Sequence, residues 1–231
     1  FVSLSQQVYL PFWGCAFHEQ FKADAAIMAK MAPGTQLVFL YLYYAENTGS
    51  VNLTQIAKAL SLSKATCTRA INDLSASGLI SQIAEGTNKW ITTAYTKSEL
   101  LEKAYGRLKT PVDRILYVKG TAQIEHPIAS GIRALARQSM IGVNDQDGAI
   151  AISKKEAAKI PAEDICTKQY FEDFGGAVIE VWSYDPIILE RDGCVDDISL
   201  LLSMDNDPNE RVQTCLDEIR QKHGLPIKEE E

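Results

Sequence analysis

The stretch that decides the fold runs from Leu53 to Ile80 and reads LTQIAKALSLSKATCTRAINDLSASGLI. Its first part has apolar residues at the spacing of a short helix, with Thr54 as the expected N-cap: Ile56, Ala57 and Leu60. After a tight connection that ends at Ser63, a second apolar series recurs at steps of three and four: Cys67, Ala70, Ile71 and Leu74. Two short helices with apolar sides and a tight turn between them predict a helix-turn-helix.

The side of the second helix opposite its apolar stripe is small, polar and cationic. At about 100° per residue, that side carries Ala65, Arg69, Asn72 and Ala76, with Thr68 flanking. Arginine can donate two hydrogen bonds to guanine, asparagine can pair with adenine, and small methyl groups can contact thymine. We expect Ser63 to cap this helix, Lys64 to reach phosphate at its N-terminus, and Gly78 to end it. The alternative is an ordinary helical hairpin whose outer side faces solvent.

A β-hairpin is expected directly after Gly78. Two strand-like runs, Leu79 to Ala84 and Trp90 to Ala94, flank the polar turn Glu85 to Lys89. A short strand at Val51 to Leu53 would pair with this hairpin. The order helix-turn-helix and then hairpin predicts a wing.

At these residues the chain resembles the winged-helix DNA-binding domains of bacterial regulators of the multiple-antibiotic-resistance repressor (MarR) class. The run SLSKATCTRAINDLSASGLI followed by the hairpin carries the resemblance, which covers about Thr35 to Lys109. It implies DNA contacts from two groups of residues: Ser63, Lys64, Ala65, Thr68, Arg69 and Asn72 on the second helix, and Asn88 and Lys89 at the wing tip. Wings of this class often have arginine-rich tips, whereas this one has a single lysine near Glu85.

Charge is unevenly distributed along the 231 residues, whose formal net charge is -7. Residues Ser50 to Thr110 hold eight Lys or Arg against four Asp or Glu, a net of +4, while Pro111 to Glu231 hold 13 against 23, a net of -10. Such a chain does not coat nucleic acid with its whole surface. The acidic half is expected either to point away from a duplex or to shield the cationic helix.

Cysteine usage and hydropathy predict a cytoplasmic protein. Five widely spaced cysteines without a C-x-x-C pair suggest a reducing compartment and give no zinc site. No secretory signal is visible, and the longest apolar run, Leu37 to Ala45, is far shorter than the roughly 20 residues of a membrane span. Because the sequence begins at Phe1 rather than Met, it leaves open whether residues precede it.

Breaks in the sequence pattern divide the chain into three segments. Residues 1–34 combine an aromatic stretch with no clear secondary structure and a helix from His18 to Met31, which Pro33-Gly34 ends. Residues 35–110 are the expected winged-helix domain, with a first helix over Thr35 to Glu46 that is apolar nearly all round. Its last helix, Lys97 to Lys109, serves either as a linker or dimer helix or packs back on the same domain.

Residues 111–231 are predicted to form a small α+β domain after the break at Thr110-Pro111. The expected strands are Val112 to Val118, Ala149 to Ile152 and Ala177 to Trp182, and the expected helices are Pro127 to Met140, Ser153 to Ile160 and one that begins with an Asp207 cap and stops at Gly224. Three short runs faintly resemble the C-terminal domains of abortive-infection type IV antitoxins: 130–135, 180–186 and 195–203. No functional residue is carried over from that likeness.

No catalytic, metal or cofactor site is predicted. The segment Asp205 to Asn209 has oxygens at alternate positions but lacks the glycine and the final glutamate of a calcium loop, so it is interpreted as a helix cap. The acidic group Asp192, Asp196 and Asp197 is interpreted as a solvated loop, with a metal or two-carboxylate site as the alternative. Phosphate-binding, dinucleotide and nucleophile-elbow motifs are missing from the sequence.

The sequence therefore predicts an α+β protein: a mainly helical winged helix-turn-helix domain followed by a small α+β regulatory or interaction domain. Its predicted function is sequence-specific binding of double-stranded DNA as a transcriptional regulator. A homodimer and a protein partner for the C-terminal domain are further hypotheses. The alternatives are an antitoxin-like autorepressor that binds a toxin, and a nucleotidyltransferase-like enzyme that carries a winged helix.

Overall fold

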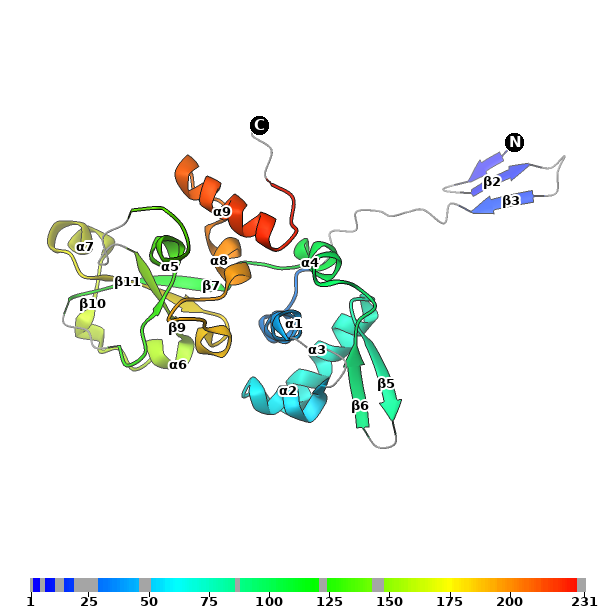
Figure 1. Cartoon of the computed structure of the whole chain (residues 1–231), viewed down its shortest axis with the longest axis horizontal. Helices are drawn as coiled ribbons and strands as arrows, with labels where there is room; N and C mark the ends of the chain where they lie inside the picture. Colours follow the sequence, from blue (N-terminus) through cyan, green and yellow to red (C-terminus); the bar gives the residue numbers. More distant parts are fainter. Residues whose placement is uncertain are drawn as a thin grey trace.

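The computed structural model describes three short strands near the N-terminus and residues 29–45, 51–85, 88–120, 124–142 and 148–227 (Figure 1). Helices and strands are mixed along the chain, and the described strands form three separate sheets. The α+β class expected from the sequence is confirmed.

The N-terminal strands are β1 (Val2–Leu4), β2 (Gln7–Leu10) and β3 (Cys15–His18). They form an antiparallel sheet in which Val2 pairs with Tyr9 and Leu10 with Cys15. The sequence left this stretch without secondary structure and placed a helix over His18 to Met31. His18 instead ends β3 and residues 29–32 are not helical, while residues 19–28 lie outside the described part of the chain.

The winged-helix part follows the predicted order. Its elements are α1 (Pro33–Tyr44), β4 (Val51–Asn52), α2 (Leu53–Ala59), α3 (Lys64–Ala76), β5 (Ser81–Glu85), β6 (Asn88–Thr92) and α4 (Lys97–Tyr105). The strands lie in the order β4-β6-β5, with Val51 opposite Ile91 and Ile83 opposite Trp90. The wing and the short strand expected to pair with it are therefore confirmed, but Glu85, Asn88 and Lys89, expected in the turn, belong to the strands.

Helix α1 is buried on nearly all sides, as its continuous apolar sequence predicts. Leu37, Val38, Phe39, Leu40 and Leu42 are each at most 2% exposed. Pro33 opens this helix at its first position, where the missing N–H costs nothing. Near this end α1 lies close to α3. A Cβ atom added to Gly34 would be only 3.0 Å from Cγ2 of Thr66.

Short-range hydrogen bonds define the ends of α2 and α3. Asn52, not Thr54, caps α2: its side chain accepts from the Gln55 N–H at 3.0 Å, and the Gln55 side chain accepts from the Asn52 N–H at 2.9 Å. This reciprocal pair satisfies two free N–H groups, which a cap at Thr54 does not offer. Ser63 caps α3 and Gly78 follows its end with φ of 72°, both as predicted.

Helix α4 packs back on the winged-helix part rather than projecting from it. Its apolar side is buried through Leu100, Leu101 and Ala104, and a capping box between Thr96 and Glu99 starts it. The helix ends at Tyr105, before the predicted Lys109. The chain beyond it stays attached, because Leu108 is buried and the Arg107 carbonyl accepts from the Met31 N–H at 2.8 Å.

The C-terminal half (residues 111–227) is a mixed sheet with helices. Its strands are β7 (Val112–Val118), β8 (Ile128–Ala129), β9 (Ala149–Ser153), β10 (Ile165–Cys166) and β11 (Ala177–Trp182), in the order β10-β7-β11-β9-β8. Only the pairing of β9 with β11 is parallel among these described strands. Its helices are α5 (Gly131–Gln138), α6 (Lys154–Ala157), α7 (Lys168–Phe174), α8 (Asp197–Met204) and α9 (Glu210–Lys222), with 3-10 turns at Ala162–Asp164 and Pro186–Leu189.

Several predicted boundaries in this half are wrong. The helix expected from Pro127 to Met140 is shorter, because Ile128 pairs with Ala151 as strand β8 before α5 begins. The helix expected from Ser153 to Ile160 is the four-residue α6. Asn209 rather than Asp207 caps α9, with its side chain accepting from the Arg211 N–H at 3.0 Å, while Asp207 accepts from the Asn209 N–H.

The two halves share one hydrophobic core. A single cluster of buried side chains joins Leu37 and Phe39 of α1 with Leu200 and Leu201 of α8 and Leu216 of α9. A second, smaller cluster lies within the C-terminal half and includes Val118, Ile152 and Ile179. Helix α1 therefore packs against α3 on one side and against the C-terminal helices on another (Figure 1).

Candidate nucleic-acid interface

Helix α3 exposes the side predicted to face DNA. Its apolar stripe is almost completely buried, with Cys67, Ala70, Ile71 and Leu74 at most 1% exposed. The predicted contact residues on the other side are all exposed: Ser63, Lys64, Ala65, Thr68, Arg69 and Asn72. We call these six residues the outward face of α3. The described residues of the C-terminal half leave this face exposed.

Members of the outward face differ in how much of their hydrogen-bonding capacity is free. Ser63 Oγ accepts from the Thr66 N–H at 3.1 Å, and Thr68 Oγ1 donates to the Lys64 carbonyl at 2.8 Å. Within the described part of the chain, the side chains of Lys64, Arg69 and Asn72 have no intramolecular hydrogen bond or ion pair. The side chains of Lys64, Arg69 and Asn72 are therefore available to a ligand. The Ser63 and Thr68 hydroxyls already make hydrogen bonds within the helix.

An ion pair fixes α3 from its flank. Asp73 lies 2.9 Å from Nη2 of Arg107, whose side chain is only 8% exposed, and Nε of Arg107 donates to the Ala29 carbonyl at 3.3 Å. The Arg107 guanidinium therefore offsets part of the negative charge of Asp73 beside the outward face. The same contact ties α3 to the chain that follows α4, so the outward face is held on a fixed support.

For the two predicted wing residues, Asn88 and Lys89, the structure describes the backbone alone. Asn88 and Lys89 begin β6, opposite Glu85 and Ala84 of β5, next to the turn. Their side chains lie outside the described residues, so their contact with DNA stays a prediction. Figure 1 shows β5 and β6 as a ribbon that extends away from α1. On this ribbon Ile83 is 56% exposed, which the alternating sequence pattern did not single out.

The structure adds one cation that sequence spacing could not place near α3. A hollow of about 340 Å³ lies between the α2–α3 turn and α6, and its lining includes Ser61, Leu62, Lys154 and Lys155. Lys154 is paired with Asp113 at 2.8 Å. Lys155 is exposed and has no ion pair among the described residues. About ninety residues of sequence separate the α2–α3 turn from α6, so no sequence periodicity could link the two sides of this hollow.

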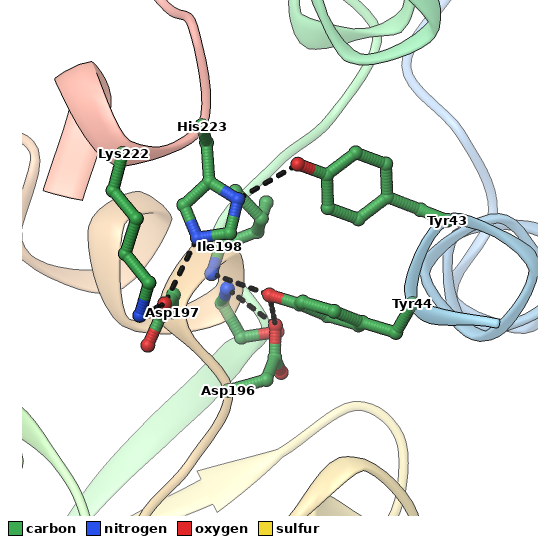
Figure 2. Close-up of polar contacts among 8 residues, drawn as sticks. Tyr43, Tyr44, Asp196, Asp197, Ile198, Lys222 and His223 are labelled. Carbon is green, nitrogen blue, oxygen red and sulfur yellow. Dashed lines mark hydrogen bonds and ion pairs between the residues drawn. The ribbon is translucent and has the colours of Figure 1, made fainter. Parts of the chain in front are cut away.

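Behind α1 lies a cluster of polar side chains that joins the two halves; we call it the α1 junction (Figure 2). Tyr43 Oη lies 2.7 Å from Nδ1 of His223, and Nε2 of His223 lies 2.9 Å from Oδ2 of Asp197. Lys222 Nζ is 2.7 Å from the same carboxylate oxygen. Burial, and then the nearby Asp197 charge, raise the pKa of Tyr43 to about 12.

A second chain of contacts in the α1 junction runs through Tyr44. Its hydroxyl donates to Asp196 Oδ1 at 3.0 Å and accepts from the Ile198 N–H at 3.1 Å. Asp196 is 2% exposed and caps α8 by accepting from the Ser199 N–H at 3.0 Å. Burial raises the pKa of Asp196 above its usual range, against the hydrogen bonds from Ser199 and Tyr44.

The acidic group considered as a metal or catalytic site therefore has structural roles. The interpretation of this group as a solvated loop is wrong for Asp196, which is buried, and for Asp197, whose carboxylate is paired with Lys222 and His223. Asp192 is exposed in a turn, with φ of 51°. In the described part of the chain, no three His, Cys, Asp or Glu side chains are grouped as metal ligands are.

Comparison with known proteins identifies the winged-helix part. No curated protein and no solved structure was found to match the chain. The likeness of the C-terminal half to abortive-infection antitoxins is unsupported. No described helix is long and apolar enough to cross a membrane. Residues 35–89, from α1 to the start of β6, match the model of the MarR family, which is consistent with a winged-helix domain like those of DNA-binding transcription regulators.

Proposed function

We propose that the protein is a sequence-specific transcription regulator that reads duplex DNA with the outward face of α3. The observation that carries this proposal is the free state of Lys64, Arg69 and Asn72 on an exposed helix whose opposite side is buried. The MarR family match over residues 35–89 supports it.

The residues of the outward face divide by the chemistry they offer. Arg69 and Asn72 lie mid-helix, where side chains reach base edges, and their forked donors and amide suit guanine and adenine. Ala65 and the methyl group of Thr68 suit the thymine methyl. Lys64 lies at the helix start, where it would bind phosphate together with Ser63 and the free N–H groups. By its backbone position, Lys89 would reach phosphate from the wing, with Asn88 beside it.

Lys155 extends the proposed phosphate contacts beyond the winged helix. It lies at the hollow beside the α2–α3 turn and has no carboxylate partner in the described residues. A cation there lies next to the N-terminal end of α3, where a duplex backbone would pass. The acidic C-terminal half would thus contribute one positive charge, Lys155, that attracts DNA phosphate. Its other described residues leave the outward face of α3 exposed.

A regulatory role for the C-terminal half is supported by its contacts with α1. The shared core and the α1 junction connect α8 and α9 to α1, and α1 packs directly on α3. A ligand or partner that binds the C-terminal half better in one arrangement of these helices would change the population of DNA-competent molecules. A homodimer is compatible with this role.

The direct test begins with selection of bound duplexes from a random DNA pool. Affinity for the selected duplex is then measured with Arg69→Ala, for which we expect a loss of about 1–3 kcal/mol and relaxed preference at one position. Arg211→Ala is the matched control, because it removes the same charge from an exposed position on α9. Unchanged affinity and preference in Arg69→Ala would show that α3 does not read bases.

A further inference from the structure

A second cationic site lies in the C-terminal half, away from the outward face of α3. A hollow of about 300 Å³ opens between α5, the turn before α8, and the end of α9. Its lining includes three cations, Arg137, Arg191 and Lys222, together with Asp192, Cys194 and Asp197. Such a volume admits a small molecule rather than a peptide or a duplex.

Two of these cations lack a counter-charge. Lys222 is paired with Asp197 at 2.7 Å. Within the described part of the chain, neither Arg137 nor Arg191 has a carboxylate within ion-pair distance. Among the described residues, Arg137 Nη1 donates to a neutral oxygen and a sulfur, the Gly193 carbonyl at 3.3 Å and Sγ of Cys194 at 3.7 Å.

A tight turn holds the two guanidinium groups at one rim. Arg191 and Cys194 exchange backbone hydrogen bonds of 3.0 and 2.9 Å, and between them Asp192 and Gly193 both have positive φ, 51° and 75°. This is the Asp-Gly arrangement favoured in two-residue turns. A Cβ on Gly193 would lie 3.1 Å from Arg137 Nη1, so the turn and Arg137 touch. The nearby Glu190 carboxylate accepts from the Gly193 N–H rather than pairing with either arginine.

We propose that this hollow binds a small oxyanion, carried by a phosphate or carboxylate group, between Arg137 and Arg191. Guanidinium groups bind such anions through two parallel hydrogen bonds, and they remain charged at all physiological pH values. Two arginines that form no ion pair among the described residues supply, at one rim, the charge and the donors that an oxyanion requires. Lys222 also lines the hollow, but its charge is offset by Asp197, 2.7 Å away in the same lining.

Arg191 links the proposed anion site to the winged-helix part. Cζ of Arg191 lies 4.5 Å from the ring centroid of Tyr44, the α1 residue that hydrogen-bonds Asp196. An anion that fixes Arg191 would hold it over this ring and so stabilise the present packing of α1 on α8. The outward face of α3 is exposed in this packing. The anion should therefore raise DNA affinity; this second step, unlike the binding itself, rests on the proposed function.

Calorimetry on the full chain tests the binding. Inorganic phosphate, pyrophosphate and succinate are titrated separately at an ionic strength held constant with sodium chloride. We expect saturable binding of at least one anion at one site, weakened at least ten-fold in the double variant Arg137→Gln/Arg191→Gln. Arg211→Gln, which removes one exposed arginine at the other end of α9, should leave it unchanged. The three titrations distinguish phosphate from carboxylate as the recognised group.

Two results would overturn the site: no saturable binding of any of the three anions, or equal affinity in the double variant. Both arginines are exposed, so the double variant should retain the circular dichroism spectrum and cooperative unfolding of the native chain. The thermal midpoint gives a second readout, because an anion that binds the folded chain must raise it in the native protein and not in the double variant.

DNA binding is then measured with and without the anion at matched ionic strength. We expect at least three-fold tighter binding of the selected duplex in the native chain and no change in the double variant. An anion that binds by calorimetry but leaves DNA affinity unaltered would overturn the coupling to α1. If the protein fails to bind any duplex, the proposed function falls, while the calorimetric result still decides the anion site.

Discussion

The outward face of α3 and the α1 junction contain similar kinds of side chain and use them in opposite ways. On α3, Lys64 and Arg69 have no partner within the described chain. In the α1 junction, Asp197 is paired with two groups and Tyr43 with one, all at 2.7 to 2.9 Å. Paired polar groups stabilise the fold, and unpaired exposed ones are free to bind a ligand. Variants of the two regions should therefore affect different measurements.

The largest effect is expected from Asp196→Ala, on stability. The change removes the cap of α8 and leaves the Tyr44 hydroxyl and the Ser199 N–H without an acceptor in a buried site. We expect a loss of about 3 kcal/mol in the free energy of unfolding, measured by urea denaturation. Asp196→Asn keeps an oxygen acceptor and should cost much less. Equal losses in the two variants would mean that hydrogen bonding is not what this residue supplies.

The next effect concerns pH and the Asp197 carboxylate. Burial opposes its ionisation, but hydrogen bonds from His223 and Lys222 outweigh burial and lower its pKa from 3.8 to about 2. Because the folded-state pKa is the lower one, this contribution to stability is present above about pH 4 and is lost as pH falls towards 2. After allowance for solvent screening it amounts to about 1–2 kcal/mol.

The pH effect is isolated by comparison with Asp197→Asn. The difference in unfolding free energy between the native chain and this variant should shrink between pH 4 and pH 2, while other carboxylates titrate in both proteins. A difference that stays constant over this interval would show that His223 and Lys222 do not favour the ionised form.

A smaller effect is expected from Lys64→Ala, on DNA binding alone. Loss of one phosphate contact should weaken all duplexes about equally and reduce the slope of log affinity against log salt by about 0.9. Stability should change by less than about 0.5 kcal/mol, because Lys64 is exposed. Lys155→Ala should reduce the slope in the same way, whereas Lys168→Ala on α7 is the control that should not. A change in sequence preference would assign Lys64 to base recognition instead.

The smallest effect tests the charge asymmetry. Figure 1 shows β10 at the end of the C-terminal half that is far from α3, and Glu163 lies just before this strand. At physiological salt, charges act over about 8 Å, so Glu163→Gln should change DNA affinity by less than about two-fold. A larger gain in affinity would mean that the acidic half approaches the duplex in solution.

Much of the winged helix could be predicted because short-range rules govern it. The stripe from Cys67 to Leu74, the Ser63 cap and the glycine after α3 all depend on residues within four positions of one another. The Asn52 cap was missed because Thr54 is also a good capping residue and only the reciprocal bond with Gln55 distinguishes them. Helix α6 was predicted too long for a similar reason, since its sequence is compatible with more turns than the tertiary structure forms.

The contacts that join the two halves could not be predicted in this way. Tyr43 and His223 are 180 residues apart, and Tyr44 and Asp196 are 152 apart. No periodicity connects such pairs, and each residue alone has an ordinary interpretation: tyrosines in a helix, or acids in a loop. Lys155 reaches the neighbourhood of α3 through the same kind of long-range packing.

The shared core also determines when the molecule is completed during its synthesis. Helix α1 emerges from the ribosome about 150 residues before the α8 and α9 side chains that cover it, a delay on the order of ten seconds or more. During that time the nascent chain contains α1 and α3 without the C-terminal helices that cover α1. A product that terminates early therefore leaves apolar side chains of α1 exposed and open to chaperones and proteases. The packing of α1 against the C-terminal helices is therefore complete only in a chain that has been translated through α9.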